Sequence, residues 1–295
     1  MLARLKEHNN MNNFSSICSR REFFRRSAAV VGGAVAARYL PAAFAAGGTQ
    51  IGAQLYTVRE ACKADFAGAM KKVAALGYRA VQVSGDNGKT AAQTKKICDD
   101  NGLAIMATHV NLADFEKGLD PILKDHETLQ CRYIGIPYIA APLRKTKEDW
   151  LKLAEKFEKW AKELKARGFT LMYHNHAFEF EAVYDGKAAI HLLYDNAPTL
   201  QAEPDLYWIA KGKADPAEFV AKFKNRAPMI HCKDMDKTDG SFAEVGYGKL
   251  DWDAILKVCK EVGALGYLVE QDKCKRDPFD SLKMSLEFLK SKGLK

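Results

Sequence analysis

The sequence predicts an α/β protein, a (β/α)8 barrel that forms a single domain over residues 47–295 and follows an export signal. From residue 50 onward, short apolar runs alternate with longer amphipathic runs. Eight such pairs fit into roughly 250 residues, which is the usual size of this barrel. The alternative is a doubly wound open sheet. No GxGxxG pattern follows the first apolar run, which removes the main reason to prefer that fold.

The first 46 residues have the three-part pattern of a cleavable twin-arginine export signal. Arg20-Arg21 precedes a Phe-Phe pair, an alanine-rich apolar stretch covers 27–37, and an Ala-x-Ala cleavage site ends the segment. The apolar stretch is too short to span a bilayer stably. We therefore expect a periplasmic protein with no membrane attachment after cleavage. The alternative is an amphipathic helix that remains on the protein.

Positive charge is concentrated in this N-terminal segment. Residues 1–46 carry seven Lys and Arg against two Glu, so the formal net charge of +8 falls by 5, to +3, for the remainder. The high isoelectric point of the whole chain is therefore weak support for nucleic-acid binding. We expect no nucleic-acid partner, and the sequence leaves a homo-oligomer open.

Each predicted strand is a short apolar run, and the eight follow one another at fairly even spacing. In chain order they cover 51–57, 79–84, 103–110, 133–139, 169–175, 199–205, 227–233 and 266–271. Longer amphipathic stretches between them predict the helices. The clearest covers 146–167, where apolar side chains recur at helical spacing.

Helix starts and ends are marked by Asp-Pro pairs and by glycines. The pairs at 120–121, 215–216 and 277–278 each place a capping carboxylate before a proline suited to the first helical turn. Gly77, Gly102 and Gly168 each precede a predicted strand, where a left-handed residue can end the preceding helix.

Residues that can bind a metal or carry protons gather at the carboxyl ends of the predicted strands. In a barrel of this class the chemistry lies at that rim. A single histidine in a strand is more often structural, so the recurrence over five strands carries the argument. The residues are His109 on strand three, His174 and His176 on strand five, Glu203 and Asp205 on strand six, His231 on strand seven and Glu270 on strand eight.

Strand alternation assigns these residues to faces. His174 and His176 share a face, as do Glu203 and Asp205, while Lys233 shares the face of His231. A mixed set of imidazoles and carboxylates suits Mn²⁺, Co²⁺, Zn²⁺ or Fe²⁺ better than Ca²⁺. The sequence therefore predicts one divalent metal ion at the rim.

These residues lie in stretches that resemble the sugar phosphate isomerase/epimerase family, the xylose-isomerase-like barrels. The family includes inosose dehydratases, ketose 3-epimerases, hydroxypyruvate isomerases and, more distantly, endonuclease IV enzymes. The resemblance is specific for the family and not for one reaction within it. The matching stretches are QLYTVR (54–59), YHNHAFEF (173–180), DLYWIAKGKADP (205–216), HCKDMDK (231–237), GYGKLDW (246–252) and VEQD (269–272).

The resemblance implies one divalent metal held by four side chains from strands five to eight. By position these are His174, Asp205, His231 and Glu270. His174 is a departure, because many relatives have Glu in a Glu-Asn-His motif there. His176 and Glu179 therefore remain alternative ligands from the same stretch.

The resemblance also implies roles around the metal. Glu270 is the candidate base, His109 and His176 are candidates to carry a proton, and Lys233 is a candidate to hold an anionic or hydroxyl-rich group. For Lys233 the alternative is a surface salt bridge with Asp234. The residues expected at the substrate are Tyr56, Gln54, Trp208, Glu179 and Glu203, with plain core packing as the alternative for Trp208.

Family chemistry begins with removal of a proton from a carbon next to a carbonyl, while a metal stabilises the enediolate. Relatives that epimerise use two facing glutamates, and only Glu270 is retained here. We therefore expect elimination or isomerisation of a keto-sugar, keto-inositol or 3-keto-glycoside. One alternative is a non-catalytic periplasmic sugar-binding barrel. A remote one is a nuclease like endonuclease IV, whose extra metal ligands the sequence lacks.

Overall fold

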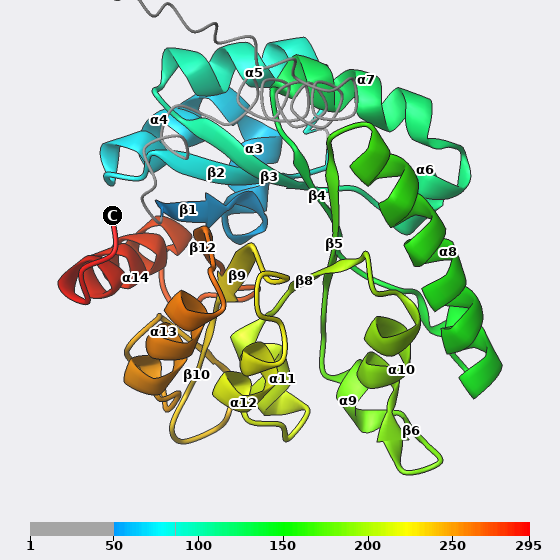
Figure 1. Cartoon of the computed structure of the whole chain (residues 1–295). Helices are drawn as coiled ribbons and strands as arrows, with labels where there is room; N and C mark the ends of the chain where they lie inside the picture. Colours follow the sequence, from blue (N-terminus) through cyan, green and yellow to red (C-terminus); the bar gives the residue numbers. More distant parts are fainter. Residues whose placement is uncertain (1–49, 86) are drawn as a thin grey trace, which may run out of the picture. The chain divides into compact units, whose positions relative to one another are not determined.

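A computed structural model of the chain describes residues 50–85 and 87–295, and eight parallel strands form its centre (Figure 1). The predicted export signal lies outside the described residues. The strands pair in the order β8-β5-β4-β3-β2-β1-β12-β9, so all eight predicted strands are confirmed. They are β1 (Gln50–Gln54), β2 (Ala80–Ser84), β3 (Ala104–His109), β4 (Tyr133–Ile136), β5 (Thr170–His174), β8 (Gln201–Glu203), β9 (Met229–Cys232) and β12 (Gly266–Val269).

The barrel is nearly closed, and its last seam lies between β8 and β9. These two strands stand at the ends of the pairing order. They are joined by one isolated parallel bridge between Asp205 and His231. Two backbone hydrogen bonds support the seam, from Ala202 N–H to the Arg226 carbonyl and from His231 N–H to the Pro204 carbonyl, each 2.8 Å long.

Helices lie around the outside of the strands (Figure 1). In the described part of the chain none is long and apolar enough to cross a membrane. Two short antiparallel pairs extend the loops, β6 (Val183–Tyr184) with β7 (Lys187–Ala188) and β10 (Asp234–Met235) with β11 (Phe242–Ala243). The helices are η1 (Leu55–Val58), α3 (Arg59–Ala64), α4 (Phe66–Ala75), α5 (Ala91–Asp100), α6 (Leu112–Glu116), α7 (Leu119–Leu129), η2 (Ala141–Leu143), α8 (Lys147–Ala166), α9 (Phe178–Glu181), α10 (Ala189–Asn196), α11 (Leu206–Lys211), α12 (Pro216–Ala221), α13 (Trp252–Glu261) and α14 (Pro278–Ser291).

Most predicted helix boundaries are confirmed, and one is wrong. Asp215 and Asp277 are the N-caps of α12 and α14, and Thr146 caps α8. Asp120 is not an N-cap, because α7 begins at Leu119, two residues earlier than predicted, with Gly118 as its N-cap. Gly118 has φ +121°, a conformation open to glycine, and this places Asp120 inside the first turn. Its carboxylate instead pairs with Arg167 at 2.6 Å.

The barrel interior has an apolar lower layer and a polar upper layer. Three methionines and a leucine reach into the lower layer, with glycines opposite them. A Cβ on Gly266 would lie 2.5 Å from both Met106 Cε and Met229 Sδ, so glycine makes room for these side chains. The buried lower layer consists of Ala80, Met106, Ala107, Met172, Met229 and Leu268. Polar side chains replace apolar ones toward the carboxyl ends of the strands.

Candidate active site

The polar upper layer places four predicted metal ligands around one point at the rim. His174 ends β5, Asp205 follows β8 as the N-cap of α11, His231 lies in β9 and Glu270 follows β12. Their donor atoms all lie within 4.8 Å of one another. His231 Nδ1 is 2.8 Å from Glu270 Oε2, and His174 Nε2 is 3.7 Å from Asp205 Oδ2. The structure therefore brings together the set that the sequence predicts; we call it the outer group.

The outer group fits a divalent metal ion. Asp205 Oδ2 and Glu270 Oε2 are carboxylate oxygens buried at this point, each with the Lys233 ammonium within 3.1 Å. Such atoms are costly unless something satisfies them. Two carboxylates and two imidazoles are also ligands that divalent transition metals bind well.

Lys233 places an ammonium group beside the outer group. Its side chain is only 1% exposed, and its ammonium pairs with Asp205 at 2.9 Å, Glu270 at 3.1 Å and Asp272 at 2.9 Å. Asp272 was not predicted as a site residue. It follows Glu270 by two positions, and this strand-like spacing was the available signal.

The surface salt bridge between Lys233 and Asp234 is wrong. Asp234 is buried and faces the other way, where it accepts hydrogen bonds from backbone N–H groups of residues 246, 248 and 250 and from Trp252 Nε1. Because successive residues of an extended segment point to opposite sides, Lys233 enters the site and Asp234 anchors the following loop.

Burial and neighbouring charges shift the pKa values of the residues in the outer group in different directions. Burial alone would raise the pKa of Glu270, but Lys233 and the hydrogen bond from His231 outweigh it and hold that pKa below its ordinary value. Burial raises the pKa of Asp205 to about 6, although Lys233 partly offsets this. Burial would lower the pKa of His231, yet Glu203 and Glu270 raise it to about 10. Of the two carboxylates in the outer group, Glu270 is therefore the one whose ionised form is more strongly favoured.

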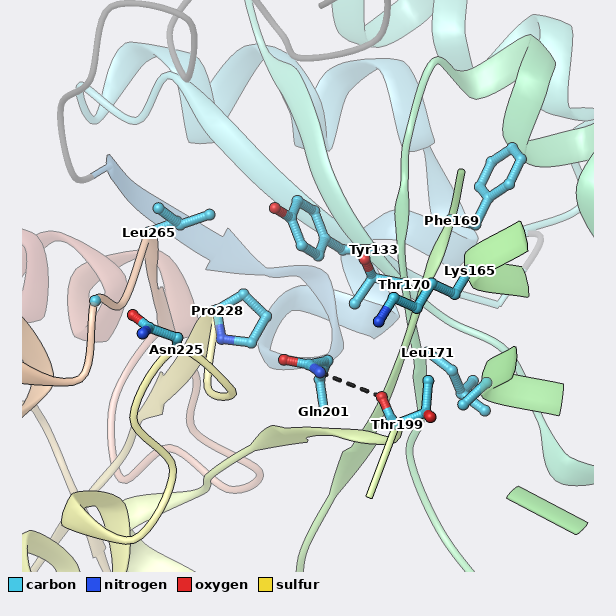
Figure 2. A pocket seen from close by; sticks show the side chains of 12 residues that line it. Tyr133, Lys165, Phe169, Thr170, Leu171, Thr199, Gln201, Asn225, Pro228 and Leu265 are labelled. Carbon is cyan, nitrogen blue, oxygen red and sulfur yellow. Dashed lines mark hydrogen bonds between the residues drawn. The ribbon is translucent and has the colours of Figure 1, made fainter. Parts of the chain in front are cut away.

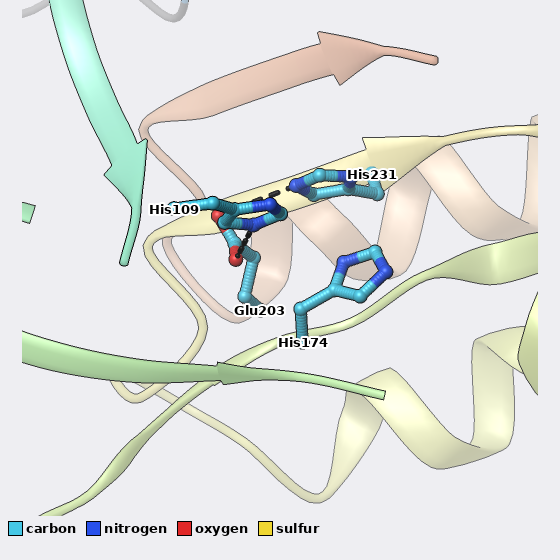
Figure 3. Close-up of side chains that lie close together, drawn as sticks. All are labelled: His109, His174, Glu203 and His231. Atoms are coloured by element: carbon cyan, nitrogen blue, oxygen red, sulfur yellow. Dashed lines mark hydrogen bonds and ion pairs between the residues drawn. The ribbon is translucent and has the colours of Figure 1, made fainter. Parts of the chain in front are cut away.

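Beneath the outer group, Glu203 takes part in a closed ring of hydrogen bonds with His109, Gln54 and Gln82. His109 Nε2 lies 2.8 Å from Glu203 Oε2, and Gln82 Nε2 donates to Glu203 Oε1 at 2.6 Å. Gln54 Nε2 donates to Gln82 and lies 3.3 Å from His109 Nδ1, which closes the ring. Figure 3 shows the Glu203 carboxylate against the His109 ring, with His231 beside that ring and His174 nearby.

The ring of hydrogen bonds affects the roles predicted for three residues, His109, Glu203 and Gln54. Both nitrogens of His109 have protein partners, so the geometry fits a residue that is held in place better than a carrier of protons. Glu203 and Gln54 are fully buried and do not line the cavity above them. Their predicted contacts with substrate stay predictions, and their observed contacts are within the ring.

Glu179 does not join the outer group. It lies in α9 and accepts hydrogen bonds from the Tyr173 hydroxyl and from the backbone N–H of His176, the latter at 2.8 Å. Burial raises the pKa of Glu179 to about 7, although these hydrogen bonds oppose the shift. Glu179 therefore positions the turn that follows β5. Of the three residues left open as ligands in this stretch, His174 is the one within the outer group.

A cavity of about 910 Å³ opens above the outer group. All four predicted catalytic residues line it, namely Glu270, His176, Lys233 and His109. The exposed rings of Tyr56 and Tyr138 also line it, and Tyr138 was not predicted. Trp208 is outside the lining, with its ring 5.2 Å from that of His176.

His176 is held by aromatic neighbours at the wall of this cavity. Its ring stacks on Phe178 at 5.5 Å with an interplanar angle of 9°, and Tyr138 meets it edge-on at 5.4 Å. Burial lowers the pKa of His176 to about 3, so its imidazole is neutral at physiological pH.

A second cavity, of about 370 Å³, lies at the opposite end of the barrel (Figure 2). It is lined where strands begin, by residues that include Tyr133, Thr170 and Gln201. Gln201 Nε2 donates to the Thr199 carbonyl at 3.2 Å. No histidine or carboxylate lines this cavity. In barrels of this class the chemistry belongs to the other face, so this end carries no candidate site.

Eight parallel strands with outer helices and a polar site at their carboxyl ends define a (β/α)8 barrel of the type that enzymes use. Residues 70–292 match the family described as "Xylose isomerase-like TIM barrel". The chain belongs to this family.

Curated relatives include inosose dehydratases. The chain is 25% identical over 174 residues to that of Clostridium perfringens and 23% identical over 177 residues to that of Bacillus thuringiensis. It spans about half the length of these relatives, 55% and 56%, and the matches cover 49% and 50% of this chain.

Solved structures of sugar phosphate isomerase/epimerases share the fold. One from Parabacteroides distasonis has a TM-score of 0.69 and 26% identity, and the match covers 82% of this chain and 98% of the other. A probable 3-DHS dehydratase from Bacillus anthracis has a TM-score of 0.63 at 12% identity, with coverage of 82% and 98%. At this identity the second likeness concerns the fold alone.

Proposed function

We propose that the protein is a divalent-metal-dependent enzyme that removes a proton next to the carbonyl of a keto-sugar or 3-keto-glycoside, leading to elimination or isomerisation. The observation that carries this is Glu270, which stays ionised, lines the cavity and belongs to the outer group at the same time. The names of the relatives, which are dehydratases, isomerases and epimerases, support the same reaction class.

The four residues of the outer group would hold the metal. Bound there, the ion would supply a positive charge that stabilises an enediolate oxygen. Lys233 adds an ammonium at the same edge of the cavity, within 3.1 Å of Glu270. A developing oxyanion beside Glu270 would therefore meet a fixed cation supplied by the protein.

Glu270 is suited to accept the proton because it is the pocket-lining carboxylate whose ionised form is favoured. His176 is neutral and keeps Nδ1 without a hydrogen-bond partner. As a neutral imidazole it can hydrogen-bond a departing or neighbouring hydroxyl oxygen. The retention of one pocket-lining glutamate beside an imidazole favours elimination over epimerisation by two facing bases.

The cavity accommodates a glycoside. Its volume of about 910 Å³ lies at the upper end of the roughly 300–1,000 Å³ range of small-molecule sites. Tyr56 and Tyr138, with exposed fractions of 43% and 47%, offer apolar ring faces near its mouth.

We also propose export by the twin-arginine route. Sequencing the N-terminus of protein recovered from periplasm, with an intact N-terminus as the contrary result, tests this.

The proposed reaction is tested by exchange of a substrate proton in D₂O. The protein is stripped of metal, reconstituted with Mn²⁺, Co²⁺ or Zn²⁺, and followed by NMR with 3-keto-glucosides, inosose and free ketoses. We expect metal-dependent exchange or elimination, lowered about 10²–10⁴-fold in Glu270→Gln. Glu60→Gln is the control, because Glu60 is exposed and outside the cavity lining.

Two results would contradict the proposal. One is full exchange activity in Glu270→Gln. The other is protein that binds these sugars equally well with and without metal and never exchanges a proton, which would favour the sugar-binding alternative.

A further inference from the structure

A second group of metal-capable side chains lies beneath the outer group, inside the barrel. It consists of His109, His174, Glu203 and His231, whose donor atoms all lie within 4.8 Å of one another (Figure 3). His109 and Glu203 belong to this inner group alone, while His174 and His231 are common to both groups. The proposed reaction uses no ion at this place.

We propose that the inner group is a second divalent-cation site, suited to Zn²⁺ or Co²⁺. Three imidazoles and one carboxylate form a four-ligand set of the kind these ions bind in tetrahedral geometry. The nitrogen-rich composition sets it apart from the outer group, which has two imidazoles and two carboxylates. The preference for Zn²⁺ and Co²⁺ over Mn²⁺ is correspondingly stronger here.

An unpartnered atom supports this site independently of the donor count. His174 Nδ1 has no hydrogen-bond partner although His174 is only 3% exposed. His231 Nε2 is 3.3 Å from Glu203 Oε1, while its Nδ1 faces Glu270. The His231 ring thus offers one nitrogen to each group, and an ion beside Glu203 would also satisfy His174 Nδ1, which the protein leaves unpaired.

The backbone also leaves room at this place. Gly135 in β4 borders the inner group, and a Cβ there would lie 2.6 Å from Glu203 Oε2 and 2.9 Å from His109 Cδ2. Its φ is not in the left-handed region, so the need for glycine is one of space. A side chain at this position would push the two ligands unique to the inner group out of place.

Surrounding hydrogen bonds orient the ligands. Gln82 donates to Glu203, and Gln54 contacts His109 Nδ1, which leaves His109 Nε2 directed at the carboxylate. Such outer contacts fix ligands and tune metal affinity. All four ligands come from the protein and the carboxylate is fully buried, so the ligand set is closed, with His109 and His174 forming its side toward the cavity. A closed site suits an ion that stabilises structure rather than one that binds substrate.

The first test measures metal content after the outer carboxylates are neutralised. The double variant Asp205→Asn, Glu270→Gln lacks the proposed chemistry, so an ion that it binds cannot be credited to the reaction. The full chain, stripped with chelator and dialysed against Co²⁺, should retain about one ion per chain with the visible absorption of four-coordinate Co²⁺. Adding Glu203→Gln or His109→Ala should weaken that binding at least tenfold. Absence of bound Co²⁺, or binding unchanged by both additions, overturns the site.

A second measurement does not depend on the folding of the double variant. At saturating Co²⁺ the unaltered chain should bind one more ion per chain than His109→Ala. His191→Ala is the matched control, because His191 lies in α10 away from both groups and should leave the content unchanged. Equal Co²⁺ content in the unaltered chain and in His109→Ala overturns the site.

Discussion

Replacing Lys233 with methionine removes the buried ammonium that neutralises the site. Three carboxylates lie within 3.1 Å of it, from Asp205, Glu270 and Asp272, and two of these are nearly or fully buried. Breaking a buried ion pair from one side costs about 3–5 kcal/mol, because the remaining charge is left uncompensated. In metal-free protein at pH 8 we expect Lys233→Met to lose about this much unfolding free energy.

The loss should depend on pH in a definite direction. Without the ammonium the pKa of Asp205, which burial already raises, moves further above its unfolded value near 4, and the pKa of Glu270 rises because the charge that held it low is gone. A carboxyl with a raised folded pKa contributes stability below its unfolded pKa and loses it as pH rises through the folded pKa. The deficit of Lys233→Met should therefore be smaller at pH 5 than at pH 8.

Urea unfolding of metal-free protein at the two pH values measures this deficit. Lys273→Met is the control, because Lys273 lines the same cavity but is exposed, and its removal should cost less than about 1 kcal/mol. Added Zn²⁺ should reduce the deficit, since a bound cation restores the missing charge; binding at a hundredfold excess over Kd adds about 2.7 kcal/mol. A deficit equal to that of Lys273→Met, or one independent of pH, would refute the charge-neutralising role.

Two further substitutions test buried carboxylates outside the metal groups. Glu179→Gln should gain stability relative to the unaltered chain as pH rises from about 4.5 to 7, by up to about 3 kcal/mol, because burial raises the pKa of Glu179 to about 7 and its ionised form is the costly one. Urea unfolding at pH 5 and pH 8 measures the difference, and a difference that does not change with pH contradicts it. Asp234→Asn should cost about 3 kcal/mol, because at least one of the four backbone donors or the Trp252 indole loses its acceptor. This corresponds to a drop in Tm of roughly 6–12 °C by calorimetry, and an unchanged Tm contradicts it.

The fold was predictable because a barrel repeats one local pattern eight times. Each strand needed only an apolar run and each helix an amphipathic run, so errors at single boundaries did not change the topology. The error at Asp120 shows what local signals miss. A glycine two positions earlier, able to adopt φ +121°, decided where α7 begins, and an Asp-Pro pair is not proof of an N-cap.

The outer group was predictable because parallel strands end at one rim. His174, His231 and Glu270 lie on three strands whose carboxyl ends must meet, whatever the register. The ring around Glu203 was not predictable in this way. Whether a polar side chain at the end of a strand lines the cavity or sits one layer lower depends on the stagger between strands, which a sequence does not give. Gln54 was therefore expected at the substrate and lies in the interior.

Closure of the barrel between β8 and β9 depends on the same residues as the candidate chemistry. Asp205 and His231 form the isolated bridge at this seam, and both also belong to the outer group. An ion held by these two side chains would link β8 to β9 across the seam where the two strands share a single bridge. Metal binding would then stabilise the pairing of β8 with β9, and metal loss would weaken it. Amide protons along β8 and β9 would consequently exchange with solvent more slowly in the metal-loaded protein, and occupancy could be followed from the backbone without a substrate.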